Sequence, residues 1–322
     1  MRDEAVIDRA IGCLVGAAVG DALGAPFEFG PPGAYSARFP EPVVDGIGEM
    51  VGGGQLRWAP GQFTDDTEQS LVVAHSLLER GGIDSDDLLS RLRRWGRSAN
   101  DVGSLTRAVL DSNLPADRAA FEVAAKLGRH RSASNGSLMR AAPGALFFAG
   151  AGRAGTQVAG FQLSAVTHAD PRCQWMVAVQ HELVRCLLGG DELEPALRSA
   201  IETVPPVVRV DLDPVLDSTW HPADGGPSNN TAIGAFAQSV WALRTFDSFE
   251  RVVTAVIDLG GDTDTVAAIA GANAGARFGA HAIPERWRAK VHGYVPTDDG
   301  GEQLYDADVI SDLAVQLIRS SP

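Results

Sequence analysis

The chain has 322 residues, of which 45% are hydrophobic and 21% are charged, a composition that suits a folded globular protein of one or two domains. Its formal net charge of −14 argues against a general nucleic-acid or membrane-surface binder, because such proteins carry basic patches. Three widely separated cysteines without metal-ligand spacing indicate a reduced, intracellular protein. With an acidic start and no apolar run long enough for a membrane span, we expect no signal peptide and a cytoplasmic location.

The first predicted element is a helix over residues 5–25, with an apolar face that begins at its first turns. Four glycines, Gly12, Gly16, Gly20 and Gly24, repeat every four residues along it. Each would weaken an isolated helix by about 1 kcal/mol, so close packing against another helix has to compensate for them. A membrane dimer motif has similar spacing, but the stretch is too short for one. We therefore place this helix at the centre of the fold.

The rest of the chain is expected to be helical, with two loop regions and few strands. Residues 30–62 are rich in Gly and Pro and predict a long loop, which in compact domains is usually functional or mobile. Helices follow one another from residue 65 to about 204, and the Pro-rich stretch 204–230 predicts a second loop region over the site. The remaining elements are helices at about 230–244, at 248–259, from Asp262 and from Pro284, an exposed turn at 298–301 and an amphipathic terminal helix at 304–319.

Two clusters of the same kind stand at helix entrances. Thr64-Asp65-Asp66-Thr67 precedes one helical pattern, and Asp262-Thr263-Asp264-Thr265 follows a glycine pair and opens another. Asp and Thr are favoured as N-caps, and capping is the structural alternative. One Asp would suffice for a cap, however, whereas two neighbouring carboxylates repel each other unless a cation lies between them. Clusters of oxygen ligands suit Mg²⁺ or Mn²⁺.

The pair of clusters closely resembles the motifs of the ADP-ribosylglycohydrolase family. The resemblance covers roughly residues 5–290 and implies an all-α fold, a single compact orthogonal multi-helix domain over residues 1–322 around the glycine-rich helix. It also implies a hydrolase that cleaves the C1″ glycosidic bond of an ADP-ribosylated target and releases ADP-ribose. Two divalent cations, Mg²⁺ or Mn²⁺, would be held by Thr64, Asp65, Asp66, Asp262, Asp264 and Thr265. Two such cations would also relieve the repulsion among carboxylates, which is roughly 4 kcal/mol per pair at 4 Å and an effective dielectric of 20.

Two further acids are candidate catalytic groups. The run from Gly20 to Glu28 resembles the opening motif of the family, which implies that Glu28 is an active-site acid near the metals; taken alone, it would more often be an exposed loop carboxylate. Asp101-Val102-Gly103 resembles an Asp-x-Gly motif of the dinitrogenase reductase branch, whose Asp is a proposed general base. The alternative for Asp101 is an N-cap of the helix that starts near Ser104.

Substrate contacts are expected from two other segments. Small residues at the start of a helix let backbone N–H groups approach an anion, and the run from Ser132 to Arg140 has this pattern. It resembles the Gly-Asn-Gly-Ser-Leu-Met-Arg element of the family, which implies that ribose and diphosphate contact Ser134, Asn135, Gly136 and Ser137. A lone histidine is more often structural than catalytic, but Thr167-His168-x-x-Pro171 resembles a family motif that implies a role for His168 around the substrate. Asp170 is expected to cap the helix that starts at Pro171.

The leaving group stays open at this stage. The Asp101 motif favours ADP-ribosyl-arginine in a protein, while serine, O-acetyl, nucleic-acid and small-molecule conjugates remain possible partners, and a monomer is the default. Three alternatives to this hydrolase are a non-catalytic ADP-ribose binder, a two-metal phosphoester hydrolase and a structural helical protein with two capped helices.

Overall fold

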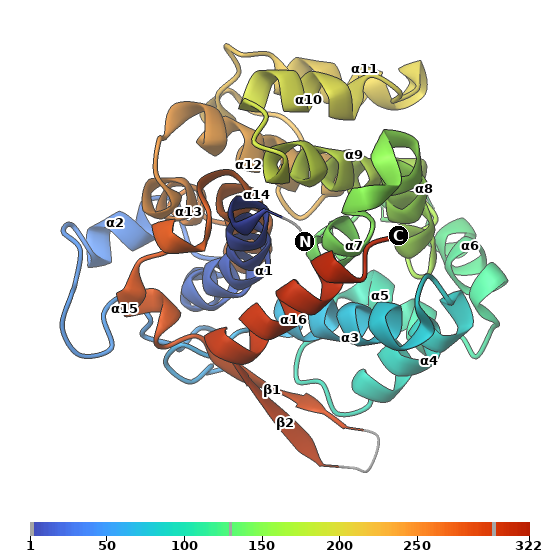
Figure 1. Cartoon of the computed structure of the whole chain (residues 1–322), viewed down its shortest axis with the longest axis horizontal. Helices are drawn as coiled ribbons and strands as arrows, with labels where there is room; N and C mark the ends of the chain where they lie inside the picture. Colours follow the sequence, from blue (N-terminus) through green and yellow to red (C-terminus); the bar gives the residue numbers. More distant parts are fainter. Residues whose placement is uncertain (1–2, 129–130, 298–300) are drawn as a thin grey trace.

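The computed structural model describes residues 3–128, 131–297 and 301–322, which are mostly helical, as the sequence predicts (Figure 1). In chain order the first elements are α1 (Glu4–Gly24), the 3₁₀ helix η1 (Ala25–Phe27), α2 (Ala34–Arg38), α3 (Asp65–Arg80), α4 (Ser85–Trp95), α5 (Ser104–Leu110), α6 (Ala116–Leu127) and α7 (Ala142–Phe147). The middle of the chain forms η2 (Ala149–Ala151), α8 (Gly152–Ala165), α9 (Pro171–Leu188), α10 (Leu193–Ile201), α11 (Pro206–Leu216) and η3 (Pro222–Asp224). The last elements are α12 (Ala232–Thr245), α13 (Phe249–Ile257), α14 (Thr263–Phe278), η4 (Ala280–Ala282), α15 (Glu285–Arg288), β1 (His292–Pro296), β2 (Glu302–Asp306) and α16 (Ala307–Arg319).

Helices α1 and α14 lie against each other at the centre of the molecule, where the glycine repeat led us to place α1 (Figure 1). They run antiparallel, and each step of four residues along α1 meets a step of four back along α14. A Cβ built on Gly20 would lie 2.0 Å from the carbonyl oxygen of Ala267, and one built on Gly275 would lie 1.8 Å from that of Gly12. The glycines therefore allow the two backbones to touch, which is the close packing that their cost in helix propensity requires.

The contact between α1 and α14 also explains why one stretch of the sequence is long and apolar enough to span a membrane. By length and mean hydropathy the segment Glu4–Phe27 could cross a membrane, contrary to the expectation that no apolar run would be long enough. However, 89% of the most apolar part of this segment is buried inside the protein. The stretch is apolar because it is the core helix, with neighbours on all sides.

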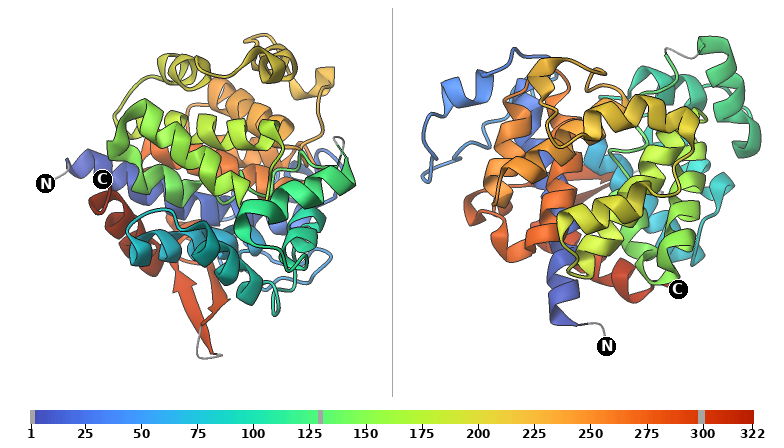
Figure 2. Two further views of the ribbon diagram at one scale, coloured as in Figure 1. Left: turned by 90° about the vertical axis from the view of Figure 1, so that its right-hand side faces the viewer. Right: turned by 90° about the horizontal axis from the view of Figure 1, so that it is seen from above.

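Other helices surround this central pair (Figure 2). Helices α12 and α13 pack on α14, α16 packs on α1, and α9 contacts α14 and carries α8 and α10 on its outer side. One hydrophobic core runs through the described residues from Ala10 to Ile318. Strands β1 and β2 form an antiparallel hairpin that extends from the helical body in Figure 1 and in the left view of Figure 2.

The structure corrects the predicted loops and the start of the last helix. The stretch 30–62 contains the short helix α2, and the stretch 204–230 contains α11. The loop over residues 204–230 was predicted because the stretch is rich in proline. Two of these prolines fit a helix, however: Pro206 occupies the first turn of α11, where its missing N–H costs nothing, and Pro214 lies near the C-terminal end. The terminal helix begins at Ala307 instead of 304, because residues 302–306 pair with β1. The predicted turn at 298–301 lies largely outside the described residues.

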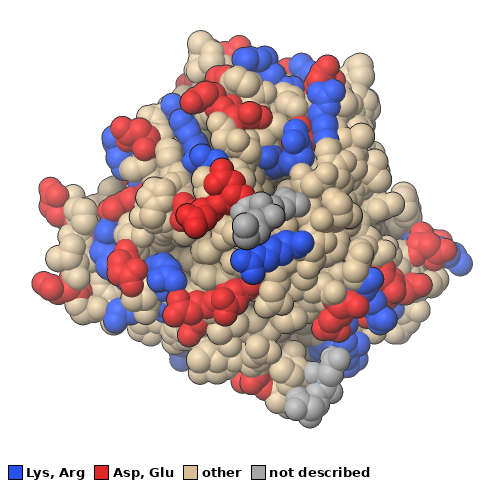
Figure 3. All heavy atoms as spheres, viewed as in Figure 1, with Lys and Arg blue, Asp and Glu red and all other residues tan. Residues whose placement is uncertain are grey.

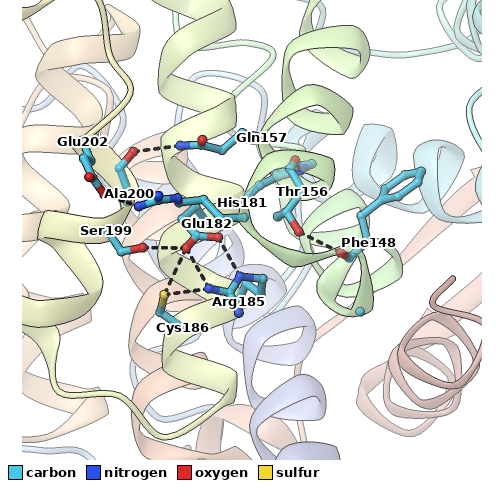
Figure 4. A network of polar contacts seen from close by, with 12 residues as sticks. Phe148, Thr156, Gln157, His181, Glu182, Arg185, Cys186, Ser199, Ala200 and Glu202 are labelled. Carbon is cyan, nitrogen blue, oxygen red and sulfur yellow. Dashed lines mark hydrogen bonds and ion pairs between the residues drawn. The ribbon is translucent and has the colours of Figure 1, made fainter.

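The buried Glu182 forms an ion pair within α9 and accepts a hydrogen bond from Ser199 that ties α10 to α9 (Figure 4). The fully buried carboxylate of Glu182 accepts hydrogen bonds from the guanidinium of Arg185 at 2.6 Å and from the hydroxyl of Ser199 at 2.8 Å. The thiol of Cys186 donates to the same carboxylate at 3.3 Å. Because each of these groups has a partner in the neighbouring helix turn, we assign the cluster a structural role.

The charged side chains on the face seen in Figure 3 are of both signs and lie intermingled, separated by wide uncharged areas.

Candidate active site

A cleft of about 540 Å³ opens where the C-terminal end of α1 meets the N-terminal ends of α3 and α14. Most residues that the sequence singled out line its wall: Glu28, Asp65, Asp66, Asp101, Ser134, Asn135, Gly136, Asp262, Asp264 and Thr265. The two acidic clusters, about 200 positions apart in the chain, therefore meet in one place. They do so because α1 and α14 are antiparallel and α3 is attached to the end of α1.

Asp21 makes that attachment, and the sequence analysis assigned it no role. Its fully buried carboxylate accepts hydrogen bonds from the backbone N–H groups of Thr64 and Thr67, each at 3.0 Å, and from the Thr67 hydroxyl at 2.5 Å. It thereby holds the first turn of α3 against α1. A single acid inside an otherwise apolar helical run was the signal that could have identified it, since a buried carboxylate needs partners.

The two clusters are in contact through Asp66. Its Oδ2 accepts long hydrogen bonds from the hydroxyls of Thr64 at 3.5 Å and Thr265 at 3.4 Å. Its Oδ1 is buried and has no hydrogen-bond partner among the described residues. Thr64 also caps α3 by accepting from the N–H of Asp66 at 3.4 Å, so the capping alternative describes Thr64 correctly without explaining why Asp65 and Asp66 are there.

Three more carboxylates converge on the same point. Ligand oxygens of Glu28, Asp262 and Asp264 all lie within 4.8 Å of one another. Asp262 is oriented by the side-chain amide of Asn135, which donates to its Oδ2 at 2.7 Å. Asp262 lies at the N-cap of α14, yet its side chain makes no capping bond, which leaves the carboxylate available for another partner.

This donor set fits divalent cations. Hard cations take six or more oxygen ligands from carboxylates and hydroxyls, and a buried carboxylate oxygen without a partner is costly in a site that binds no cation. The residues that could hold them are Glu28, Asp262 and Asp264, whose ligand oxygens lie together, and Asp65, Asp66 and Thr265 on the same cleft wall, with Thr64 behind Asp66.

Asp101 lines the cleft outside this group of ligand oxygens. The N-cap of α5 is Gly103, with no side-chain capping bond, so the capping alternative for Asp101 is wrong. Partial burial and the nearby Asp262 charge raise the pKa of Asp101 above its usual value. A half-buried carboxylate with a raised pKa and no structural task has the properties of a general base.

The predicted substrate-binding residues divide between the cleft wall and the layer behind it. Ser134, Asn135 and Gly136 lie on the wall. Ser137 is buried with its hydroxyl 2.9 Å from that of Ser164, and His168 is fully buried. The ring of His168 lies behind Ser134, whose hydroxyl is 2.9 Å from Nε2, and behind Gly136, where an added Cβ would lie 3.2 Å from the ring.

A chain of side chains links this layer to the metal cluster. Asp65 accepts from Gln69 at 2.7 Å, and Gln69 accepts from the buried guanidinium of Arg140 at 2.6 Å. Arg140 also donates to Thr167 at 2.5 Å, and Thr167 lies 2.8 Å from Nδ1 of His168. Burial beside Arg140 lowers the pKa of His168 to about 3, so the imidazole is neutral and positions Ser134 by hydrogen bonding.

We expect added Mn²⁺ to raise the melting temperature more near pH 8 than near pH 5. Burial raises the pKa of Asp66 and Asp264 well above the usual range and that of Glu28 to about 7. A carboxyl whose pKa is higher folded than unfolded stabilises the fold while protonated, and this contribution is lost as pH rises from about 4 to about 7. In that pH range protons compete with Mn²⁺ for the carboxylates. At higher pH the cation alone offsets the repulsion between the ionised carboxylates.

The measurement is a melting curve with Mn²⁺ and with EDTA at each pH. Taking the difference between the two at one pH cancels the opposite contribution of His168 and His181, whose burial lowers their pKa values. A gain that is the same at both pH values, or larger near pH 5, would contradict a carboxylate cation site.

A family model, related sequences and a solved structure all relate this chain to the same protein family. A protein-family model described as ADP-ribosylglycohydrolase matches residues 2–321. The ADP-ribosylarginine hydrolase Tri1 of Pseudomonas putida is 31% identical over 315 residues, covering 94% of this chain and 79% of that protein. The ADP-ribosyl-[dinitrogen reductase] glycohydrolase of Rhodospirillum rubrum is 30% identical over 293 residues, covering 90% and 92%. A solved structure, an ADP-ribosylglycohydrolase-related protein complex, matches with a TM-score of 0.78 at 31% identity, covering 99% of this chain and 100% of that one.

Proposed function

Since this chain belongs to the ADP-ribosylglycohydrolase family, we propose that it is a metal-dependent hydrolase that releases ADP-ribose from arginine-linked ADP-ribosyl protein. The observation that carries the proposal is that the two Asp–Thr clusters meet in one cleft, where Thr265 donates to Asp66 Oδ2 and Asp66 Oδ1 is buried without a hydrogen-bond partner among the described residues. Relatives whose names specify ADP-ribosylarginine hydrolase or ADP-ribosyl-[dinitrogen reductase] glycohydrolase support the arginine linkage.

The residues divide the chemistry among them. Asp101 accepts the proton of the attacking water as the bond from water oxygen to C1″ forms and the bond from C1″ to the guanidinium nitrogen breaks. Asn135 keeps Asp262 in place, and Ser134, held by neutral His168, presents a hydroxyl to the substrate. Divalent cations, when bound, supply Lewis acidity toward ribose hydroxyls and water.

Glu28 has a different task from Asp101 in this proposal. Its ligand oxygen lies within 4.8 Å of those of Asp262 and Asp264, and this proximity supports a role among the cation ligands. Asp101 is separate from them and free to receive a proton. We therefore assign the base role to Asp101 and a positioning role at the cation cluster to Glu28.

The test is incubation with ADP-ribosyl-arginine protein and, separately, with an ADP-ribosyl-serine peptide. Each reaction contains Mg²⁺, Mn²⁺ or EDTA, and free ADP-ribose is measured. We expect release from the arginine substrate that EDTA abolishes. Release of phosphate or nucleotide would identify a phosphoester hydrolase, and ADP-ribose binding without release from either substrate would identify a binder.

A further inference from the structure

Strained backbone positions gather at the mouth of the cleft. Within the described ranges, three residues other than glycine have positive φ: Phe29 at 57°, Arg57 at 60° and Asn113 at 54°. Asn tolerates this conformation and is common there, whereas Phe and Arg are not. The backbone of Phe29 and Arg57 is therefore strained in a way that a glycine would avoid. Both residues belong to segments at the rim of the cleft.

The aromatic ring of Phe29 contributes little burial that would offset this cost. Its side chain is 63% exposed although it is a large aromatic group. It directly follows Glu28 and lines the same cleft. Its N–H donates to the carbonyl of Gly261 at 2.7 Å, so the backbone is fixed next to Asp262 while the ring stays uncovered.

Leu56 is a second exposed apolar side chain at this rim, with 43% of its surface accessible. It lies in a turn closed by two hydrogen bonds of 2.8 Å between Gly53 and Trp58. That turn rests on η1: a Cβ on Gly54 would lie 2.7 Å from the carbonyl oxygen of Ala25. Since η1 leads directly into Glu28 and Phe29, the two apolar side chains belong to one rim.

We propose that Phe29 and Leu56 form a subsite for the leaving group, an alkyl guanidinium that departs from C1″. A planar guanidinium stacks on an aromatic face and pairs with carboxylates, and Glu28 and Asp101 lie on the same cleft wall. The methylene stem of the arginine contacts Leu56. The choice of this ligand rests on the proposed function, and the two side chains are specificity-determining residues without a part in the chemistry.

The test compares two ligands that differ only in the leaving group. Binding of ADP-ribosyl-arginine and of ADP-ribose is measured by calorimetry with Mn²⁺ in an Asp101→Asn background, in which we expect turnover to be about 10²- to 10⁴-fold slower. We expect Phe29→Ala to weaken ADP-ribosyl-arginine about tenfold, and Leu56→Ala somewhat less, with ADP-ribose changed less than about twofold. Phe121→Ala is the matched control, because Phe121 is 57% exposed on α6 and does not line the cleft.

Two results would overturn the subsite. Equal weakening of both ligands by Phe29→Ala would show that the ring contacts ADP-ribose itself, for example by stacking on the adenine. An unchanged affinity for both would show that the rim does not touch the ligand.

The experiment also distinguishes a failure of the proposed hydrolase function from a failure of the proposed subsite. A wild-type protein that hydrolyses nothing, while Phe29→Ala still loses affinity for ADP-ribosyl-arginine alone, would refute the hydrolase and support the subsite. The melting temperature of a Phe29→Gly variant tests separately whether the aromatic ring stabilises the fold. We expect its melting temperature to stay within about 3 °C of wild type, since the strain is relieved and most of Phe29 is already exposed. A larger fall would mean that the ring serves the fold.

Discussion

Asp101→Asn is expected to lower kcat by about 10²- to 10⁴-fold while leaving the affinity for ADP-ribose unchanged. The carboxamide has nearly the same shape but cannot accept a proton from water. Asp101 does not belong to the Glu28–Asp262–Asp264 group of ligand oxygens and does not cap α5, so its replacement leaves the cation site and the fold in place. The measurement is single-turnover release of ADP-ribose, together with calorimetric binding of ADP-ribose.

Asp111→Asn is the matched control, because Asp111 is exposed at the other end of α5. Its turnover should equal that of the wild type. Normal turnover in the Asp101 variant would refute the assignment and leave Glu28 as the remaining candidate base. A parallel loss of ADP-ribose affinity would instead mean that Asp101 helps to hold the product.

The sequence was informative where a residue type has no ordinary structural reason to be present. Paired acids next to threonine at two helix starts are unusual, and they identified residues that the structure brings into one cleft. Glycines at a spacing of four predicted the central helix for the same reason, since only a close contact compensates for them.

Other features were out of reach because they depend on tertiary contacts. The link from Asp65 through Gln69 and Arg140 to His168 joins residues from three segments, and only the tertiary fold brings them into contact. The strain at Phe29 is a backbone angle that no local pattern reveals. Helix α11 was hidden by prolines, which fit the first turn of a helix as well as a loop.

A large loss of stability is expected from Gly271→Ala. In most helices this change is stabilising by about 1 kcal/mol, because alanine is the better helix former. Here the added Cβ would lie 2.1 Å from the carbonyl oxygen of Gly16, and the atom it meets is backbone that cannot rotate away. We expect a loss of about 3 kcal/mol or more in the free energy of unfolding, measured by urea denaturation. Gly82→Ala is the control, since a Cβ there meets nothing within 4 Å.

The same substitution should also weaken cation binding, although Gly271 lies well inside α14. Helix α1 carries Asp21 near its C-terminal end, and α14 carries Asp262 and Asp264 at its start. To accommodate the new methyl group, the two helices have to part by roughly 1 Å, since real Cβ contacts essentially never fall below 3.0 Å. Asp21 holds the first turn of α3, so this movement separates Asp66 from Asp264 and enlarges a site whose ligands must reach one cation. A variant that is destabilised but binds Mn²⁺ as tightly as the wild type would show that the site is positioned independently of the glycine contact.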